Sequence, residues 1–282
     1  MWSNAEPFIA CDMPYEAAHT VLLGAPFDST TSNRPGARFG SRAMRSESYG
    51  LETYSPYQDK DLTDCAVYDS GDLELPFGAA DVALSLIETR AGEILQDGKR
   101  PLLLGGEHLV TLGAVRAAAV RYSDLHVIHF DAHADLRDEY IGVKLSHACV
   151  IRRCWDLLGD GRIFQFGIRS GDRAEFEWGK KHVQTRLFDF EGLTELATQL
   201  SAKPVYLTID LDVLDPAAFP GTGTPEAGGV SFAALLDAAL MVCRRANVVA
   251  VDLVELAPTL DAGGVSTATA CKLLREMLIA LS

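Results

Sequence analysis

Short apolar runs alternate with longer amphipathic stretches along the whole chain. A short continuous apolar run indicates a buried strand, whereas apolar residues that recur every three or four positions indicate a helix. On this basis we predict strands at residues 20–24, 65–69, 101–104, 126–131, 163–168, 205–210 and 248–253. We predict helices at residues 80–96, 109–122, 147–158, 191–201, 232–245 and 266–281.

This alternation of strands and helices is typical of an α/β protein. Strands that are apolar throughout are buried on both faces, so the pattern predicts a mainly parallel sheet covered by helices on both sides. Neither a low-complexity linker nor an internal repeat divides the chain. We therefore expect a single domain over residues 1–282, a length that suits one large α/β core.

Composition and charge exclude several classes of function. A formal net charge of −14 argues against a nucleic-acid partner, because phosphates require Lys and Arg. No apolar stretch approaches the roughly 18 residues that span a bilayer, so we expect no membrane association. The six cysteines are scattered without a Cys-x-x-Cys pair, which is typical of reduced core residues. The first residues do not resemble a signal peptide, so we expect a cytoplasmic protein.

Two groups of polar residues come at the ends of predicted strands. Asp131, His133 and Asp135 follow one strand, and Asp210 and Asp212 follow another. Side chains at positions i, i+2 and i+4 of an extended chain point in the same direction. Carboxylates that crowd together repel one another unless protons or cations neutralise them. The two groups therefore predict a metal cluster.

Two more predicted strands end near residues of the same type. The strand at 101–104 runs into a glycine turn that leads to His108, and the strand at 248–253 is followed by Glu255. Ligand sites in open parallel sheets collect at the carboxyl ends of strands. Carboxylate and imidazole ligands suit Mn²⁺, Fe²⁺, Co²⁺ or Zn²⁺, and the excess of oxygen without a thiolate favours Mn²⁺. Six ligands with shared carboxylates fit two ions better than one, and paired ions generate hydroxide near neutral pH, so we predict a hydrolase.

Six motifs in a fixed order carry a family resemblance. They lie at residues 34–40, 105–108, 131–135, 146–147, 210–216 and 254–258, and so span nearly the whole chain. In these motifs the chain resembles the ureohydrolase family, which contains arginases, agmatinases, guanidinobutyrases and formiminoglutamases. Residues 48–57 and 105–110 are most similar to the bacterial agmatinases of the family. The resemblance implies a three-layer αβα sandwich, usually assembled as a homotrimer or homohexamer.

The resemblance also implies a role for each candidate residue. One Mn²⁺ would be held by His108, Asp131, Asp135 and Asp210, and a second by His133, Asp131, Asp210 and Asp212. A hydroxide that bridges the two ions would attack the guanidinium carbon of a small cationic substrate. Asp135 would orient the hydroxide and pass on its proton, and Glu255 would pair with the guanidinium. His147 would deliver a proton to the departing amine.

Some of these residues also have simpler interpretations. His147 suits a polar residue at a helix start with Ser146 as its N-cap, and Glu255 suits a structural ion pair. Cys149 lies two residues from His147, but a bridging hydroxide leaves no need for a thiol nucleophile. We expect Asp215 and Asp252 to form hydrogen bonds to metal ligands and so orient them.

The sequence also indicates roles for three other histidines and two loops. We interpret His126, His129 and His182 as structural, although His129 alternates with Asp131 along one strand and can approach the site. The polar loops at residues 29–40 and 214–230 each follow a strand, and we expect both to wall a pocket.

The segment between Asp135 and His147 bears on the substrate. Arginases recognise the amino-acid end of arginine through an Asn and small polar residues in this segment, and no Ser-Gly-Asn element is present here. We therefore expect agmatine, cleaved to putrescine and urea. Guanidinobutyrate has a carboxylate tail that a cation at the pocket mouth would bind, and Arg34, Arg137 and Lys144 keep this substrate as an alternative.

Three alternatives remain at this stage. One is another ureohydrolase, such as an arginase or a formiminoglutamase. The second is a catalytically silent regulatory homologue, which the presence of all six ligand positions disfavours. The third is a two-metal hydrolase of phosphate esters, which the acidic balance and the lack of a phosphate-binding glycine loop with Lys disfavour.

Overall fold

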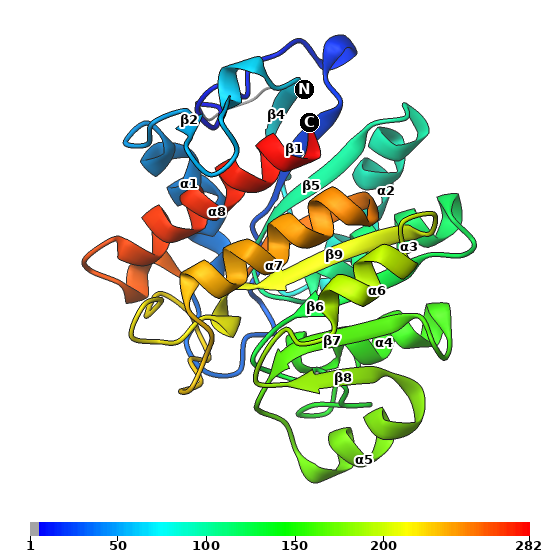
Figure 1. Ribbon diagram of the computed structural model, residues 1–282. Helices are drawn as coiled ribbons and strands as arrows, with labels where there is room; N and C mark the ends of the chain where they lie inside the picture. Colours follow the sequence, from blue (N-terminus) through cyan, green and yellow to red (C-terminus); the bar gives the residue numbers. More distant parts are fainter. Residues whose placement is uncertain (1–5) are drawn as a thin grey trace.

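A parallel β-sheet runs through the centre of the fold, with helices on both of its faces (Figure 1). The structure is a computed structural model that describes residues 6–282. In this part of the chain, eight strands form the sheet in the order β4-β1-β5-β10-β9-β6-β7-β8, and all neighbouring pairs are parallel. The strands are β1 (Thr20–Ala25), β4 (Val67–Asp72), β5 (Arg100–Gly105), β6 (His126–Phe130), β7 (Ile163–Ile168), β8 (Gln184–Leu187), β9 (Pro204–Asp210) and β10 (Asn247–Val254).

The helices form the two outer layers (Figure 1). One face of the sheet carries α1 (Gly40–Ser48), α6 (Leu193–Gln199), α7 (Phe232–Arg245) and α8 (Val265–Leu281). The other face carries α2 (Ala80–Gln96), α3 (Val110–Arg121), α4 (Val150–Leu158) and α5 (Arg173–His182). None of the helices between residues 6 and 282 combines the length and hydrophobicity of a membrane-spanning segment.

Short elements connect these layers. A hairpin of β2 (Tyr54–Ser55) and β3 (Lys60–Asp61) is antiparallel. The 3₁₀ helices are η1 (Tyr15–Ala17), η2 (Ala37–Phe39), η3 (Leu62–Asp64), η4 (His147–Cys149), η5 (Leu211–Val213) and η6 (Pro258–Leu260).

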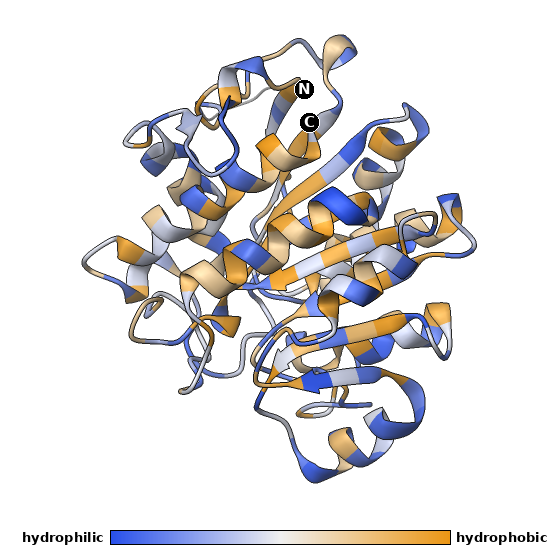
Figure 2. Cartoon of the chain, viewed as in Figure 1, coloured by the Kyte–Doolittle hydropathy of each residue, from blue (hydrophilic) through white to orange (hydrophobic). Residues whose placement is uncertain are grey.

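Alternate residues of each central strand pack into different hydrophobic cores. In β1, Leu22 belongs to the core beneath α7 and α8, whereas Val21 and Leu23 belong to the core beneath α2 and α3. In β5, Leu102 likewise belongs to the core beneath α7 and α8, and Leu103 belongs to the core beneath α2 and α3. Figure 2 shows the hydrophobic residues concentrated along these strands. The two cores on either side of one sheet are the packing of a three-layer αβα sandwich, so the predicted fold class is confirmed.

The predicted helices and strands agree with the structure, except for elements that consist largely of polar residues. Helices α2 and α7 have the predicted bounds, and the predicted helix at 147–158 begins with η4 before α4. The prediction was wrong to leave out α1, α5 and the edge strand β8. The buried face of α1 consists mainly of Gly, Ser and Arg, and β8 is largely exposed, so neither has an apolar period for the sequence to reveal.

Candidate metal centre

The candidate residues gather at the carboxyl ends of four neighbouring strands, β5, β10, β9 and β6. His108 lies in the turn after β5, and Asp131 directly follows β6. Asp210 is the last residue of β9, and Glu255 directly follows β10. These strands are all parallel, so their ends meet at one edge of the sheet, where α/β proteins bind ligands.

One half of the site surrounds the His108 imidazole. Three carboxylate oxygens face its Nδ1 atom: Asp131 Oδ2 at 3.0 Å, Asp210 Oδ2 at 3.2 Å and Asp135 Oδ2 at 3.4 Å. The His108 side chain is only 1% exposed. Although burial opposes protonation, the three carboxylates raise the pKa of His108 well above its usual value. Burial also raises the pKa of Asp135 to about 7. The arrangement therefore needs positive charge at its centre.

A buried relay determines which nitrogen of His108 carries the hydrogen in the neutral ring. His108 Nε2 lies 2.9 Å from Thr208 Oγ1, and the Thr208 hydroxyl donates to Asp252 Oδ1 at 2.6 Å. Because that hydroxyl proton is engaged by Asp252, Thr208 must accept from Nε2–H. The lone pair of Nδ1 then faces the three carboxylates. Among the described residues Nδ1 has no hydrogen-bond partner, and a cation among these donors would satisfy both the ring and the carboxylates.

The other half of the site surrounds His133. Its Nδ1 lies 3.0 Å from Asp212 Oδ2 and 3.4 Å from Asp131 Oδ1. The two carboxylate oxygens of Asp131 thus face different imidazoles, Oδ2 toward His108 and Oδ1 toward His133. Asp210 Oδ1 accepts from the backbone N–H of Asp212 at 2.8 Å, which joins the two halves. This geometry fits a pair of cations that share Asp131.

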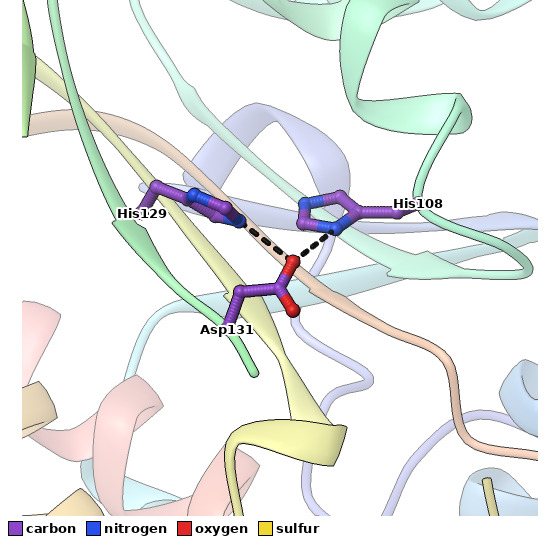
Figure 3. Close-up of side chains that lie close together, drawn as sticks. All are labelled: His108, His129 and Asp131. Carbon is purple, nitrogen blue, oxygen red and sulfur yellow. Dashed lines mark hydrogen bonds and ion pairs between the residues drawn. The ribbon is translucent and has the colours of Figure 1, made fainter. Parts of the chain in front are cut away.

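His129 contacts the carboxylate of Asp131, which both halves of the site share (Figure 3). Its Nε2 lies 2.8 Å from Asp131 Oδ2, and its Nδ1 lies 3.0 Å from Gln165 Nε2. An amide nitrogen only donates, so His129 Nδ1 accepts and its Nε2–H donates to Asp131. His129 therefore differs from His108, whose Nδ1 lone pair faces Asp131; Figure 3 shows both rings beside this carboxylate. His129 thus makes a direct hydrogen bond to the carboxylate that both halves share, and its structural role stays a prediction.

His147 and Glu255 each make hydrogen bonds beside the metal centre. The His147 Nδ1 lies 3.0 Å from the Thr30 carbonyl, which only accepts, so the neutral ring carries its hydrogen on Nδ1. Nε2 is then a bare acceptor, 3.2 Å from Ser32 Oγ, and burial lowers the His147 pKa to about 4. Glu255 Oε1 accepts from the His108 backbone N–H at 2.8 Å.

Backbone strain marks two of the candidate carboxylates. Asp135 has a φ of 52° and Glu255 a φ of 65°, in the left-handed region that favours glycine. Such strain is concentrated at functional sites, where the surrounding structure maintains it. Burial raises the pKa of Glu255 well above its usual value, with the nearby Glu107 adding to the shift. In the described part of the chain, Glu255 forms no ion pair with Lys or Arg, so the structural ion pair considered for it is not formed.

Comparison with known proteins identifies the family. Residues 18–280 match the arginase family. The chain belongs to the arginase family.

Relatives of this arginase-family chain match it over almost their full length. An agmatinase of Bacillus anthracis is 47% identical over 280 residues, which cover 98% of this chain and 96% of the relative. An agmatinase of Bacillus subtilis is 46% identical over 279 residues, with the same coverage of 98% and 96%. The crystal structure of agmatine ureohydrolase of Thermoplasma volcanium superposes with a TM-score of 0.90 at 34% identity, covering 99% of this chain and 94% of that one. The resemblance to ureohydrolases is confirmed.

A cavity of about 280 Å³ opens beside His133, Asp135 and His147. The loop at 29–40 contributes Ser32 to its lining, and the loop at 214–230 contributes Thr224, so both loops wall the pocket as predicted. The same two loops are joined by hydrogen bonds, including one from Arg34 Nη2 to the Thr222 carbonyl at 2.8 Å.

Asp172, Glu175 and Arg137 also line this cavity. Arg137 pairs with Asp172 at 2.9 Å and with Glu175 at 3.4 Å.

Other residues singled out in the sequence agree with expectation only in part. Asp215 accepts from the backbone N–H groups of residues 217, 228 and 229, so it shapes a turn and the expectation that it orients a ligand was wrong. Asp252 does contact the site, through Thr208. Ser146 makes no capping bond to its helix and instead donates to Cys149 Sγ at 3.4 Å. Burial raises the pKa of the Cys149 thiol, which does not favour a nucleophile.

His126 and His182 bond to residues outside the metal centre, and their rings pack against Phe164 and Trp178, respectively. The ring of His126 is bonded to the Asp124 carbonyl, and that of His182 to Asp160, as expected of structural residues.

The sequence reasoning missed several residues that support the site. Thr208, Gln165 and Glu107 are fully buried polar residues whose contacts lie far away in the sequence. Arg169 donates to the carbonyls of Asp212 at 2.7 Å and of residues 213, 214 and 226, so it holds the loop that carries Asp212. The one available signal was that each follows or occupies a predicted strand near the ligand residues.

Proposed function

We propose that this chain is a manganese-dependent ureohydrolase that cleaves the guanidinium group of agmatine to give putrescine and urea. In this proposal residues 1–282 act as a single ureohydrolase domain. The observation that carries it is the geometry of Asp131, whose two carboxylate oxygens face the different imidazoles of His108 and His133. Relatives that are named agmatinases, 46–47% identical over 98% of this chain, support the choice of agmatine.

The proposed metal ligands are those expected from the sequence. One Mn²⁺ would be held by His108, Asp131, Asp135 and Asp210, and the other by His133, Asp131, Asp210 and Asp212. Oxygen ligands outnumber nitrogen ligands and include no thiolate, which favours Mn²⁺ over softer metals. When bound, two such ions would supply a hydroxide at neutral pH.

The remaining steps belong to side chains of this chain. Glu255 binds the substrate guanidinium, because its buried carboxylate has no cationic partner among the described residues. Asp135 accepts the proton that the attacking water loses. After oxygen has added to the guanidinium carbon, the bond from that carbon to the alkyl nitrogen breaks, and this nitrogen must gain a proton to leave. His147 first takes up a proton from solvent in the cavity at Nε2, the nitrogen that its hydrogen bond to Thr30 leaves unprotonated, and then passes it to the departing nitrogen.

The charges in the cavity support a substrate with a cationic tail. Asp172 and Glu175 line the cavity beyond His133 and Asp135, and they engage Arg137 in two ion pairs. Arg137 is therefore committed to carboxylates of the protein and is a poor partner for the carboxylate of guanidinobutyrate. An alkylammonium tail suits this acidic surrounding better.

The cellular setting of the proposal follows the same reasoning. All six cysteines are free and buried, which suits a reducing cytoplasm. We propose assembly as a homotrimer or homohexamer on the strength of the family resemblance.

The proposal is tested by urea release from a panel of substrates. Protein loaded with Mn²⁺ is assayed for urea with agmatine, guanidinobutyrate and arginine, and for formamide with formiminoglutamate. We expect kcat/KM for agmatine to exceed that for arginine by at least about tenfold, or about 1.4 kcal/mol of transition-state discrimination. Faster turnover of guanidinobutyrate would move the assignment to guanidinobutyrase. No urea from any guanidino substrate would contradict the proposal, and the absence of formamide as well would favour a silent regulatory homologue.

A further inference from the structure

Glu107 is a buried carboxylate that the proposed reaction does not use. It lies between Gly106 and His108, and its exposed fraction is 0%. Among residues 6–282, no Lys, Arg or His forms an ion pair with it. Burying a carboxylate without a cation is costly, so its hydrogen bonds must serve a definite purpose.

Among residues 6–282, the donors to the Glu107 side chain all come from the loop at residues 30–31. The backbone N–H of Thr30 lies 3.1 Å from both carboxylate oxygens. The Thr30 hydroxyl donates to Oε1 at 2.7 Å, and the Thr31 hydroxyl donates to Oε2 at 3.0 Å. Glu107 therefore fixes both the backbone and the side chain of Thr30.

Thr30 in turn makes two contacts with His147. The His147 backbone N–H donates to Thr30 Oγ1 at 3.2 Å, and the ring Nδ1–H donates to the Thr30 carbonyl at 3.0 Å. Ser32, from the same loop, lies 3.2 Å from the ring Nε2. The orientation and the tautomer of His147 are thus set by a loop that Glu107 holds in place.

We propose that Glu107 is a positioning residue, which acts through Thr30 to keep the His147 ring protonated at Nδ1 and unprotonated at Nε2. The inference rests on the proposed function, in which His147 transfers a proton. Glu107 itself touches neither the substrate nor the reacting atoms. Losing it would let the loop and the ring adopt other orientations, in which Nε2 no longer meets the departing nitrogen.

The hydrogen-bond pattern predicts which replacements of Glu107 are tolerated. A glutamine can keep this pattern, because its oxygen can accept from the N–H and hydroxyl of Thr30 while its NH₂ donates to a rotated Thr31 hydroxyl. A leucine of similar volume can accept nothing. Glu107→Gln and Glu107→Leu therefore separate the loss of hydrogen bonding from the loss of charge.

The test is a double-mutant cycle with His147→Ala, measured as urea release from agmatine by the Mn²⁺-loaded protein. We expect Glu107→Leu to lower kcat at least about 30-fold with KM changed less than about threefold, the pattern of a lost proton transfer. Glu107→Gln should restore most of that loss. In the His147→Ala background, Glu107→Leu should lower kcat by less than about twofold, because residues that act through one another are not additive.

Glu93→Leu is the matched control. Glu93 is an exposed glutamate on α2 that pairs with Arg90, and its replacement should leave kcat and KM unchanged. If Glu107→Leu does not fold, Thr30→Val takes its place in the cycle. It removes the hydroxyl but keeps the carbonyl, so we expect a smaller loss of kcat that also disappears in the His147→Ala background.

A second readout does not depend on turnover. In protein that carries ¹⁵N-labelled histidine and diamagnetic Zn²⁺, the His147 ring should give one protonated Nδ1 signal and one bare Nε2 signal, and Glu107→Leu should average them. Equal losses of kcat in both backgrounds, or an unchanged ring spectrum in Glu107→Leu, would overturn the inference. If the wild-type protein releases no urea, the proposed function fails and the ring spectrum alone decides the role of Glu107.

Discussion

Replacing Thr208 by valine tests how the fold orients the proposed metal ligand His108. The Thr208 hydroxyl accepts from His108 Nε2 at 2.9 Å and donates to Asp252 Oδ1 at 2.6 Å, and all three residues are essentially inaccessible to solvent. Valine has nearly the same shape but cannot form either hydrogen bond. His108 then loses the contact that keeps its hydrogen on Nε2 and its lone pair directed toward the carboxylates.

The magnitude follows from these contacts. Removing a hydrogen-bond partner behind a metal ligand costs about 10- to 100-fold in metal affinity, or about 1.4–2.7 kcal/mol. The buried Nε2–H left without a partner also lowers the free energy of unfolding of the metal-free protein by about 1–3 kcal/mol. Asp252 keeps its hydrogen bond from the Tyr206 hydroxyl at 2.6 Å, so we expect the fold to survive.

The assay is competition between the protein and a chelator for Mn²⁺, with urea denaturation of the metal-free protein measured in parallel. Thr111→Val is the matched control. Thr111 is equally buried, but its Oγ1 lies 3.5 Å from Thr208 Oγ1, farther than either hydrogen-bond partner in the relay. We expect it to change the Mn²⁺ affinity less than about threefold. If Thr208→Val lowers stability but leaves the Mn²⁺ affinity equal to that of Thr111→Val, the relay does not orient His108 and the reasoning is refuted.

Three further predictions concern the site and its pH dependence. Asp131→Asn should abolish urea release and lower the metal content together, whereas His147→Ala should lower kcat by at least about 100-fold with the metal content unchanged. Elemental analysis and kinetics of each variant check both predictions. Loss of metal from His147→Ala would contradict the role proposed for His147. In the metal-free protein the neighbouring carboxylates raise the pKa of His108 and His133, and burial raises that of Asp135 to about 7. Protons on these groups compete with the metal at low pH and leave as the pH rises, so Mn²⁺ affinity, measured by chelator competition, should increase from about pH 6 to about pH 9. With limiting Mn²⁺, urea release should increase over the same range, and full activity at about pH 6 would contradict this account.

The sequence predicted the central strands and the candidate ligands for one physical reason. Strands buried on both faces must be apolar throughout, so a charged residue directly after such a strand stands out. The same reasoning fails for α1, whose buried Arg45 is stabilised by Asp69, a residue on a different element. An edge strand such as β8 has little apolar surface to bury, and its sequence resembles that of a loop.

Supporting residues of the site were harder to find than the ligands. His129 was interpreted as structural, but only the contact with Gln165 reveals which of its nitrogens donates to Asp131. Glu107 gains its role through Thr30, 77 positions earlier in the chain. Asp215 follows a ligand motif in sequence, yet its side chain turns to local backbone N–H groups. Tertiary contacts decide these roles, and local sequence does not record them.

The most direct test of the central claim is a titration of metal-free protein with Mn²⁺, followed by urea release from agmatine. The account predicts no urea without metal and an increase in activity that saturates at two ions per chain, because Asp131 faces both histidines and is shared between the ions. Undiminished turnover in protein shown to be metal-free, or saturation at a single ion, would contradict it.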